Sequence, residues 1–186
     1  MRLLTIDTET TGLQPAIHQI LTVGLLVIEV EKDHLKMLES LHIPVKHKCY
    51  RADKKALMVN RICLERHHKI SIEPKMACEK ISRFIEENNL GSTPLLGHNI
   101  AFDLSFLTEL FRKEKKRYPF AKKFYDTMFI WNALKRQGRV PSHLNSTLQT
   151  IAEYFKIDYS NAHDALSDCE ITSTAYHKMI QLQETF

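Results

Sequence analysis

The hydrophobic pattern of the first 45 residues constrains the fold of this chain most. Three stretches rich in Ile, Leu and Val, separated by short connections, predict extended strands. These strands are expected at Leu3–Thr8, Gln19–Val30 and Leu35–Val45. Because consecutive strands with short connections tend to pair as neighbours, we expect an antiparallel meander.

After this region the pattern changes to a helical period that alternates with short strands. Ala77, Ile81, Phe84 and Ile85 fall on one face of a helix. Further helices are expected at Ala101–Arg112, Thr127–Arg136, Thr147–Phe155 and Asp168–Gln183, and short strands at Pro94–Gly97 and Phe124–Asp126. Strands followed by strand–helix alternation predict an α/β fold with a mixed β-sheet flanked by helices. The 186 residues suit a single domain, 1–186.

Composition excludes several classes of protein. Apolar residues make up 44% of the chain and charged residues 26%, with few Gly and Pro, which excludes disordered and collagen-like chains. No apolar run approaches the roughly 18 residues of a membrane helix. The early Asp7 argues against a signal peptide, and four widely spaced cysteines are typical of a reduced intracellular protein. We therefore expect a cytoplasmic protein without a membrane partner.

The positive charge of the chain is concentrated in one segment. The formal net charge is +4, a mild bias towards anionic partners, but seven of the twelve residues in Arg112–Lys123 are basic. A solvated helix end followed by a loop is one interpretation of this segment. A patch that contacts nucleic-acid phosphates is the other.

Two carboxylates stand at the end of the first predicted strand, in Asp7-Thr8-Glu9. Because side chains alternate along a strand, Asp7 and Glu9 point to the same face of the sheet. Two like charges at this spacing repel each other unless a cation lies between them, and hard divalent cations prefer oxygen ligands. The pair therefore indicates a metal site, with a solvated strand end as the alternative.

Two later segments each contribute a further carboxylate. Asp103 falls on the first turn of a predicted helix, where the helix dipole favours an acid. His163 and Asp168 are five positions apart, which on a helix places them about 140° out of phase. For both to face one site, His163 must lie in the loop before the helix and Asp168 within it. A histidine above an acidic cluster can carry a proton near neutral pH.

Three segments, taken in order, match the pattern of one enzyme family. They are Ile6-Asp-Thr-Glu-Thr-Thr-Gly-Leu13, His98-Asn-Ile-Ala-Phe-Asp-Leu-Ser-Phe106 and Ala162-His-Asp-Ala-Leu-Ser-Asp168. Together they resemble the DnaQ-type 3′→5′ exonucleases of the DEDDh class, which include proofreading exonucleases of the DNA polymerase III epsilon type. Ala56–Ile62 and Tyr125–Thr127 resemble two smaller segments of this family, and the resemblance extends from residue 3 to about residue 180.

The resemblance implies a ribonuclease-H-like fold and a two-metal-ion phosphodiesterase. Asp7, Glu9, Asp103 and Asp168 would hold two Mg²⁺ or Mn²⁺ ions, and His163 would be the general base that deprotonates the attacking water. Two cations can activate the water and stabilise the leaving 3′-oxygen. An imidazole with an ordinary pKa of about 6.5 suits proton removal at pH 7–8.

The resemblance also implies which residues bind the terminal nucleotide. These are Thr10, Thr11, Gly12, Leu13, His98, Asn99, Phe102 and Phe106. Leu13 would pack against the last base, and aromatic stacking tolerates every base. Asp126 is expected to cap a helix rather than to bind metal. The chain departs from the family pattern at Arg61, where Gly is frequent, and at Cys169, where Ala is common.

Four functions stay open at this point. The first is a DNA 3′→5′ exonuclease for proofreading or repair, whose partner is nucleic acid with a free 3′ end and whose association with a polymerase is left open. The second is an RNA 3′→5′ exonuclease of the tRNA-trimming or oligoribonuclease type. A non-catalytic nucleic-acid or polymerase-binding module is the third, and a non-nuclease metal protein is the fourth. The intact acids and His163 argue against the third, and the ordered motifs argue against the fourth.

Overall fold

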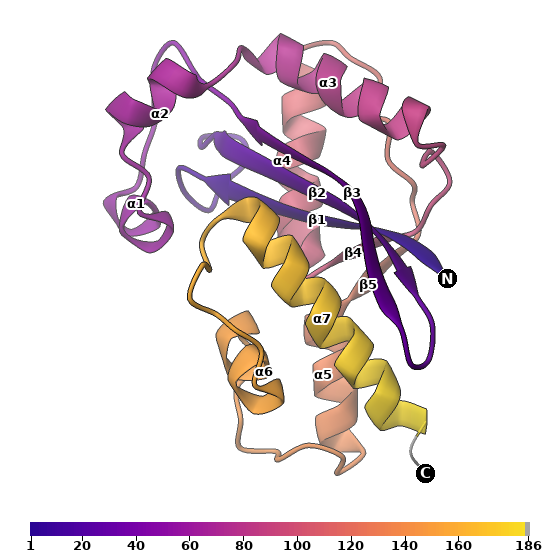
Figure 1. Cartoon of the computed structure of the whole chain (residues 1–186). Helices are drawn as coiled ribbons and strands as arrows, with labels where there is room; N and C mark the ends of the chain where they lie inside the picture. The colour runs from indigo at the N-terminus through magenta and orange to yellow at the C-terminus, as the bar shows by residue number, and fades with distance from the viewer. Residues whose placement is uncertain (185–186) are drawn as a thin grey trace.

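The computed structural model describes residues 1–184, which form a five-stranded sheet with helices on both faces (Figure 1). The strand order is β3-β2-β1-β4-β5. The strands are β1 (Arg2–Thr10), β2 (Ile20–Val30), β3 (Leu35–Pro44), β4 (Leu95–Gly97) and β5 (Phe124–Asp126). The first three pair antiparallel, β4 is parallel to β1, and β5 is parallel to β4. The predicted meander and mixed sheet are confirmed.

Helices cover both faces of the sheet (Figure 1). They are α1 (Lys54–Asn60), α2 (Leu64–Ile70), α3 (Pro74–Glu87), α4 (Ile100–Lys113), α5 (Thr127–Arg136), α6 (Leu148–Phe155) and α7 (Ala165–Glu184). Helices α3 and α4 cover one face, while α7 crosses the other face with α5 and α6 against it, and α1 and α2 lie beside the sheet (Figure 1). The helices α1 and α2 were not predicted, and α7 begins three residues earlier than expected. Among the described residues, no helix is long and apolar enough to cross a membrane.

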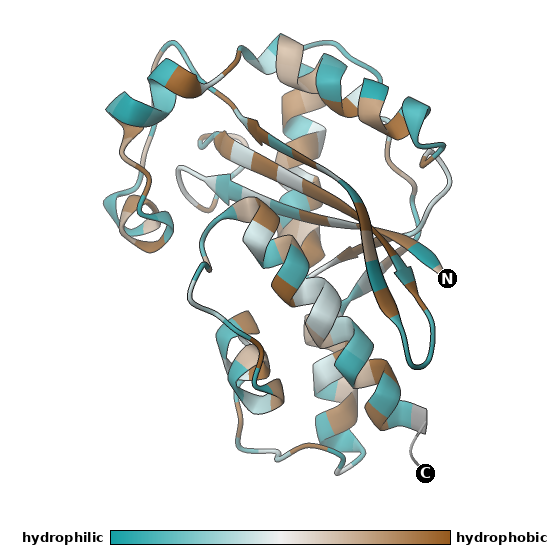
Figure 2. Ribbon diagram, in the orientation of Figure 1, coloured by the Kyte–Doolittle hydropathy of each residue, from teal (hydrophilic) through white to brown (hydrophobic). Residues whose placement is uncertain are grey.

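The side chains of β1 alternate between two hydrophobic clusters. Leu4 and Ile6 pack with α3 and α4, whereas Leu3 packs on the side of α7. The Thr5 and Ser173 hydroxyl oxygens lie 2.8 Å apart across the contact between β1 and α7. Figure 2 shows that β2, which lies between β3 and β1 in the sheet, is largely hydrophobic. By the same alternation, Asp7 and Glu9 follow Leu3 and Thr5 towards α7.

A glycine in β2 allows α7 to approach the sheet closely. Gly24 is paired with Asp7 in the strand register. A Cβ atom on Gly24 would lie only 2.3 Å from the backbone oxygen of Ala165, the first residue of α7. The Cys169 Sγ also donates a hydrogen bond to the Gly24 carbonyl oxygen, at 3.4 Å. The first turn of α7 is therefore seated directly over the strand pair that carries Asp7.

Candidate active site

The four predicted acids come together where β1 ends between the two helical layers. Asp7 and Glu9 face α7, whose first turn carries Asp168. Thr8 points to the opposite face, where α4 carries Asp103 on its first turn. The Thr8 backbone N–H and hydroxyl both donate to Asp103 Oδ1, at 2.9 and 2.7 Å. Asp103, only 3% exposed, is thereby fixed to the strand that carries the first two acids.

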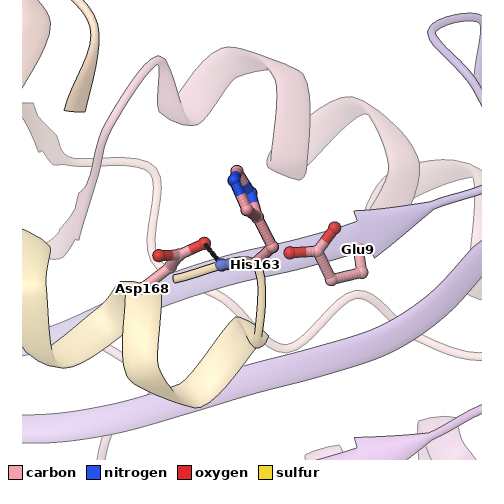
Figure 3. A group of neighbouring side chains, drawn as sticks. All are labelled: Glu9, His163 and Asp168. Carbon is pink, nitrogen blue, oxygen red and sulfur yellow. Dashed lines mark hydrogen bonds between the residues drawn. The ribbon is translucent and has the colours of Figure 1, made fainter. Parts of the chain in front are cut away.

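His163 lies between Glu9 and Asp168, as Figure 3 shows. One ligand atom from each of these three residues lies within 4.8 Å of the other two. His163 precedes α7 in a loop and has a positive φ of 72°, and its backbone N–H donates to Asp168 Oδ2 at 3.1 Å. The predicted placement of His163 in the loop and of Asp168 in the helix is confirmed.

Burial raises the pKa of all four carboxyl groups, and repulsion from neighbouring carboxylates adds to the effect. Burial raises the pKa of Asp7 well above its ordinary value, and Asp103, Asp168 and Glu9 raise it further. Burial raises the pKa of Glu9 to about 7, with Asp168 and Asp103 adding to the effect. The pKa values of Asp103 and Asp168 rise to about 7 and about 6, again chiefly through burial. Negative charge is therefore costly here unless a cation balances it.

The donor set fits divalent cations. Asp168 Oδ1 is buried and has no hydrogen-bond partner among residues 1–184. An unpartnered buried carboxylate oxygen is costly in an apolar environment, whereas it is a suitable ligand for a hard cation. The other acids that converge here also offer carboxylate oxygens, and a ring nitrogen of His163 lies beside them. On this basis the residues fit the divalent metal that the sequence predicts.

A cleft of about 350 Å³ opens beside the acids. Its walls are formed by the end of β1, by α1 and by Phe102 of α4; the lining residues are Thr8, Glu9, Thr10, Leu13, Asp53, Lys55, Ala56, Val59, Asn60 and Phe102. Three of the predicted substrate contacts, Thr10, Leu13 and Phe102, therefore lie on the cleft. Leu13 is 74% exposed, so its side chain is available to a ligand.

Helix α1 supplies the cleft residues that the sequence reasoning did not find. Asn60 Nδ2 donates to the Thr10 carbonyl oxygen at 3.0 Å, which fixes the end of α1 to the end of β1. The Asp53 backbone N–H donates to the Thr11 carbonyl oxygen at 2.7 Å. Asp53 could have indicated the start of α1 in the sequence, because Asp is a preferred N-cap residue. Its side chain accepts a hydrogen bond from the Lys55 backbone N–H. Arg61 ends α1 with a φ of 56°, a conformation that explains why Gly is frequent in the family at this position.

The other predicted substrate residues lie outside the lining of this cleft. Phe106 is only 2% exposed and packs behind Phe102, with ring centroids 4.9 Å apart. His98 Nδ1 lies 2.9 Å from the Thr127 hydroxyl oxygen, and Asn99 is an exposed residue at the start of α4. Thr11 is fully buried, and its hydroxyl donates to the Arg51 carbonyl oxygen.

Gly12 and Asp126 have structural roles in the described chain. A Cβ atom on Gly12 would lie 2.4 Å from the His18 ring, so the turn after Thr11 packs closely. The Asp126 carboxylate accepts hydrogen bonds from the backbone N–H groups of Asn99, Ile100 and Met128. It therefore joins the starts of α4 and α5, and the predicted capping role of Asp126 is confirmed.

The basic segment Arg112–Lys123 lies at the far end of α4 from the acids. Asp103 and Lys113 are ten residues apart on this helix, which corresponds to about 15 Å. Arg112 and Lys113 pair with Glu109, and Lys116 pairs with Glu79 of α3. Lys115, Arg117 and Lys122 are exposed and have no acidic partner within residues 1–184. Part of the segment is thus neutralised by the protein itself.

Comparison with known proteins gives consistent results. The model of an exonuclease family (RNase_T) matches residues 4–176. The ribonuclease T of Buchnera aphidicola subsp. Baizongia pistaciae is 26% identical over 192 residues, covering 97% of this chain and 84% of that protein.

Two solved structures are similar to the whole described fold. Exonuclease I of E. coli, in complex with a dT13 oligonucleotide, matches 98% of this chain with a TM-score of 0.82 and 18% identity. This chain spans 41% of the length of exonuclease I. The nuclease domain of 3′hExo, a DEDDh family member bound to rAMP, matches 97% of this chain and 92% of that domain, with a TM-score of 0.77 and 18% identity. The predicted ribonuclease-H-like fold is confirmed.

Proposed function

Because this chain belongs to the exonuclease family and is a 3′→5′ exonuclease of the DEDDh class, we propose that it degrades single-stranded or frayed DNA and releases nucleoside 5′-monophosphates. The observation that carries this proposal is the cleft beside the four acids. The cleft of about 350 Å³ is at the small end of the range of ligand pockets, about 300–1,000 Å³. It suits one terminal nucleotide, whose phosphate would face the acids.

The proposed roles of the residues follow from their positions. Asp7, Glu9, Asp103 and Asp168 would hold two divalent ions, Mg²⁺ or Mn²⁺, which would stabilise negative charge and make a bound water more acidic. His163 takes the proton of the attacking water. Burial and the charge of Arg61 lower the pKa of His163, which keeps the imidazole neutral and able to accept a proton at neutral pH. Leu13 and Phe102 grip the terminal base on the cleft wall.

The cleft also supports the preference for single strands. A terminal base that enters the cleft has to unstack from its neighbour and unpair from the other strand. In a duplex this costs roughly a few kcal/mol, and at a frayed end it costs less. Exonuclease I, whose fold is similar, is described in complex with a dT13 oligonucleotide, a single strand of DNA. DNA repair or proofreading is the proposed context.

RNA is the second candidate substrate. A ribonuclease T is 26% identical to this chain over nearly its whole length, and 3′hExo is described bound to rAMP. The acids and His163 serve either nucleic acid equally, because the reacting phosphodiester is the same. A tRNA-trimming or oligoribonuclease activity is therefore the alternative that the experiment has to separate.

We expect a 3′-labelled single-stranded DNA to be degraded at least about tenfold faster than the matched blunt duplex. The reason is that the terminal base of a duplex must first be unpaired, at a cost in free energy, before it can enter the cleft. The substrates are the single strand, the duplex, a duplex with a mismatched 3′ end and a short RNA of the same sequence, each with Mg²⁺ or Mn²⁺. Chromatography identifies the products, which are expected to be nucleoside 5′-monophosphates. Asp7→Asn protein, purified in parallel, controls for contaminating nucleases. Degradation of RNA alone would replace the DNA assignment by the second candidate.

The basic segment gives a separate prediction about affinity. If Lys115, Arg117 and Lys122 contact the phosphates behind the terminal nucleotide, the affinity for a 20-nucleotide strand falls steeply with salt. Changing these three residues to Gln is expected to reduce the slope of log K against log salt by about 0.7 for each lost contact. Binding is measured by fluorescence anisotropy at several salt concentrations.

The matched control for this experiment is Lys113→Gln with Lys116→Gln, because both lysines already pair with glutamates. This control is expected to change the salt slope less than the triple variant does. An equal slope in the wild type and the triple variant would show that the segment is only a solvated surface.

A further inference from the structure

The imidazole of His163 is held by few polar contacts. His163 lies in a loop with a left-handed backbone, and its backbone N–H donates to Asp168. Within residues 1–184, the hydrogen bonds of the structure include none to the His163 ring nitrogens. A general base needs a defined orientation towards the proton that it removes. Another contact has to fix the orientation of this ring.

Tyr159 makes that contact. Its ring meets the His163 ring edge to face, with centroids 6.2 Å apart and an interplanar angle of 83°. This separation and angle are typical of a favourable aromatic pair. The Ala162 N–H also donates to the Tyr159 carbonyl oxygen at 3.3 Å, so a short turn connects Tyr159 to the residue before His163.

The Tyr159 ring is itself anchored in the core. It packs against a cluster formed by Leu148 and Ala152 of α6 and by Ile171 of α7. Helix α7 carries both Ile171, which supports Tyr159, and Asp168, the acid beside His163. A ring packed in this way can restrict the orientation of a neighbouring ring that it contacts.

The hydroxyl of Tyr159 stays protonated at neutral pH. Burial raises its pKa to about 12, and the nearby carboxyl groups of Asp168, Asp7 and Glu9 add to the effect. Tyr159 is therefore neutral and adds no charge to the metal-binding cluster. Its contribution has to come from the ring contact or from the neutral hydroxyl.

From these contacts we infer that Tyr159 is a positioning residue that orients the His163 imidazole through its aromatic ring, an inference that rests on the proposed role of His163 as the base. Neither the acids nor the cleft residues supply this contact. The ring, and not the hydroxyl, does the orienting, because the observed contact with His163 is between the two rings.

Two variants separate the ring from the hydroxyl. Tyr159→Phe keeps the ring, and we expect its kcat and KM to stay within about twofold of wild type. Tyr159→Leu keeps apolar packing against α6 and α7 but removes the ring. We expect this variant to lose about 10- to 100-fold in kcat with KM nearly unchanged, since small misplacements of catalytic groups cost this much. Equal losses in both variants would overturn the proposal in favour of the hydroxyl.

A double variant tests whether Tyr159 acts through His163. In the His163→Ala background, Tyr159→Leu is expected to change kcat by less than about twofold, because the group that it orients is absent. Loss of a further 10-fold or more would show that Tyr159 acts independently. Tyr154→Leu, an exposed aromatic on α6 that packs against Trp131, is the matched control and is expected to keep wild-type kcat.

A measurement on the metal-free protein separates this inference from the proposed function. The His163 Hα–Hβ coupling constants and the NOEs from its ring protons, assigned by their loss in His163→Ala, report the orientation of the side chain. They are expected to be kept in Tyr159→Phe and to show averaging over rotamers in Tyr159→Leu. Unchanged couplings and NOEs in Tyr159→Leu would contradict positioning even if the wild-type enzyme is fully active. If the wild type degrades no strand, the proposed function fails, while the couplings and NOEs still decide whether Tyr159 orients the ring.

Discussion

Replacing Asp7 by Asn is expected to lower the rate of strand degradation by at least about 100-fold, because the variant loses one charged metal ligand at the centre of the acid cluster. Asp7 is coupled to Asp103, Asp168 and Glu9, so its charge affects the whole cluster. The rate is measured with saturating Mn²⁺ and a 3′-labelled single strand. Asp33→Asn, an exposed acid in the turn between β2 and β3, is the matched control. Cleavage by Asp7→Asn at nearly the wild-type rate would exclude the two-metal assignment.

The same variant is expected to be more stable than the wild type when metal is removed. The pKa of Asp7 is raised in the folded state, so the folded protein binds more protons than the unfolded chain between the two pKa values. The stability of the wild type therefore falls as the pH rises through this range. In EDTA at pH 8, Asp7→Asn is expected to melt about 2 °C or more above the wild type. The difference should shrink as the pH falls and vanish only near the ordinary Asp pKa of 3.8, where both states bind the proton, and saturating Mn²⁺ at pH 8 should stabilise the wild type more than the variant.

Replacing His163 by Ala is expected to lower kcat by about 10²- to 10⁴-fold, the contribution of a positioned general base. Metal binding, followed by the rise in melting temperature with Mn²⁺, should persist because the four acids remain. The matched control is His143→Ala, which removes an exposed histidine from the loop between α5 and α6. A wild-type kcat in His163→Ala would assign proton removal to another group.

The pH dependence of the wild-type rate provides a second measurement for His163. The base has to be neutral, so the rate rises with pH while the imidazole loses its proton and then reaches a plateau. Burial and Arg61 lower the pKa of His163, so the midpoint is expected below the ordinary value of about 6.5. His163→Ala should lose this rising limb. A limb that persists unchanged in the variant would show that it belongs to a different group.

The local placement of each acid could be predicted from strand and helix geometry, whereas the meeting of all four at one site was implied only by the family resemblance. Strand alternation places Asp7 and Glu9 on one face, and the helix period requires His163 to precede the helix that carries Asp168. The three long strands were predictable for the same reason, since aliphatic residues recur along each of them. These features need no knowledge of which distant segments meet.

The cleft was less predictable because it depends on contacts between distant segments. Helices α1 and α2 have seven residues each, too few for a clear helical period. Asn60 reaches the cleft only because its side chain binds the Thr10 carbonyl oxygen, 50 residues away in sequence. Phe102 and Phe106 are four residues apart on α4, yet only Phe102 lies on the cleft, because Phe106 packs into the core between α4 and the sheet.

The acid cluster also links activity to the order in which the chain is synthesised. Asp7, Glu9 and Asp103 belong to the first part of the chain, whereas His163 and Asp168 arrive only with α7, which must then seat itself over Gly24. A ribosome-bound chain made as far as α6 has three of the acids but neither the proposed base nor the fourth acid. On the proposed roles, such a nascent chain lacks the base and one metal ligand, so its activity begins only after the last helix has been synthesised and has packed against the sheet.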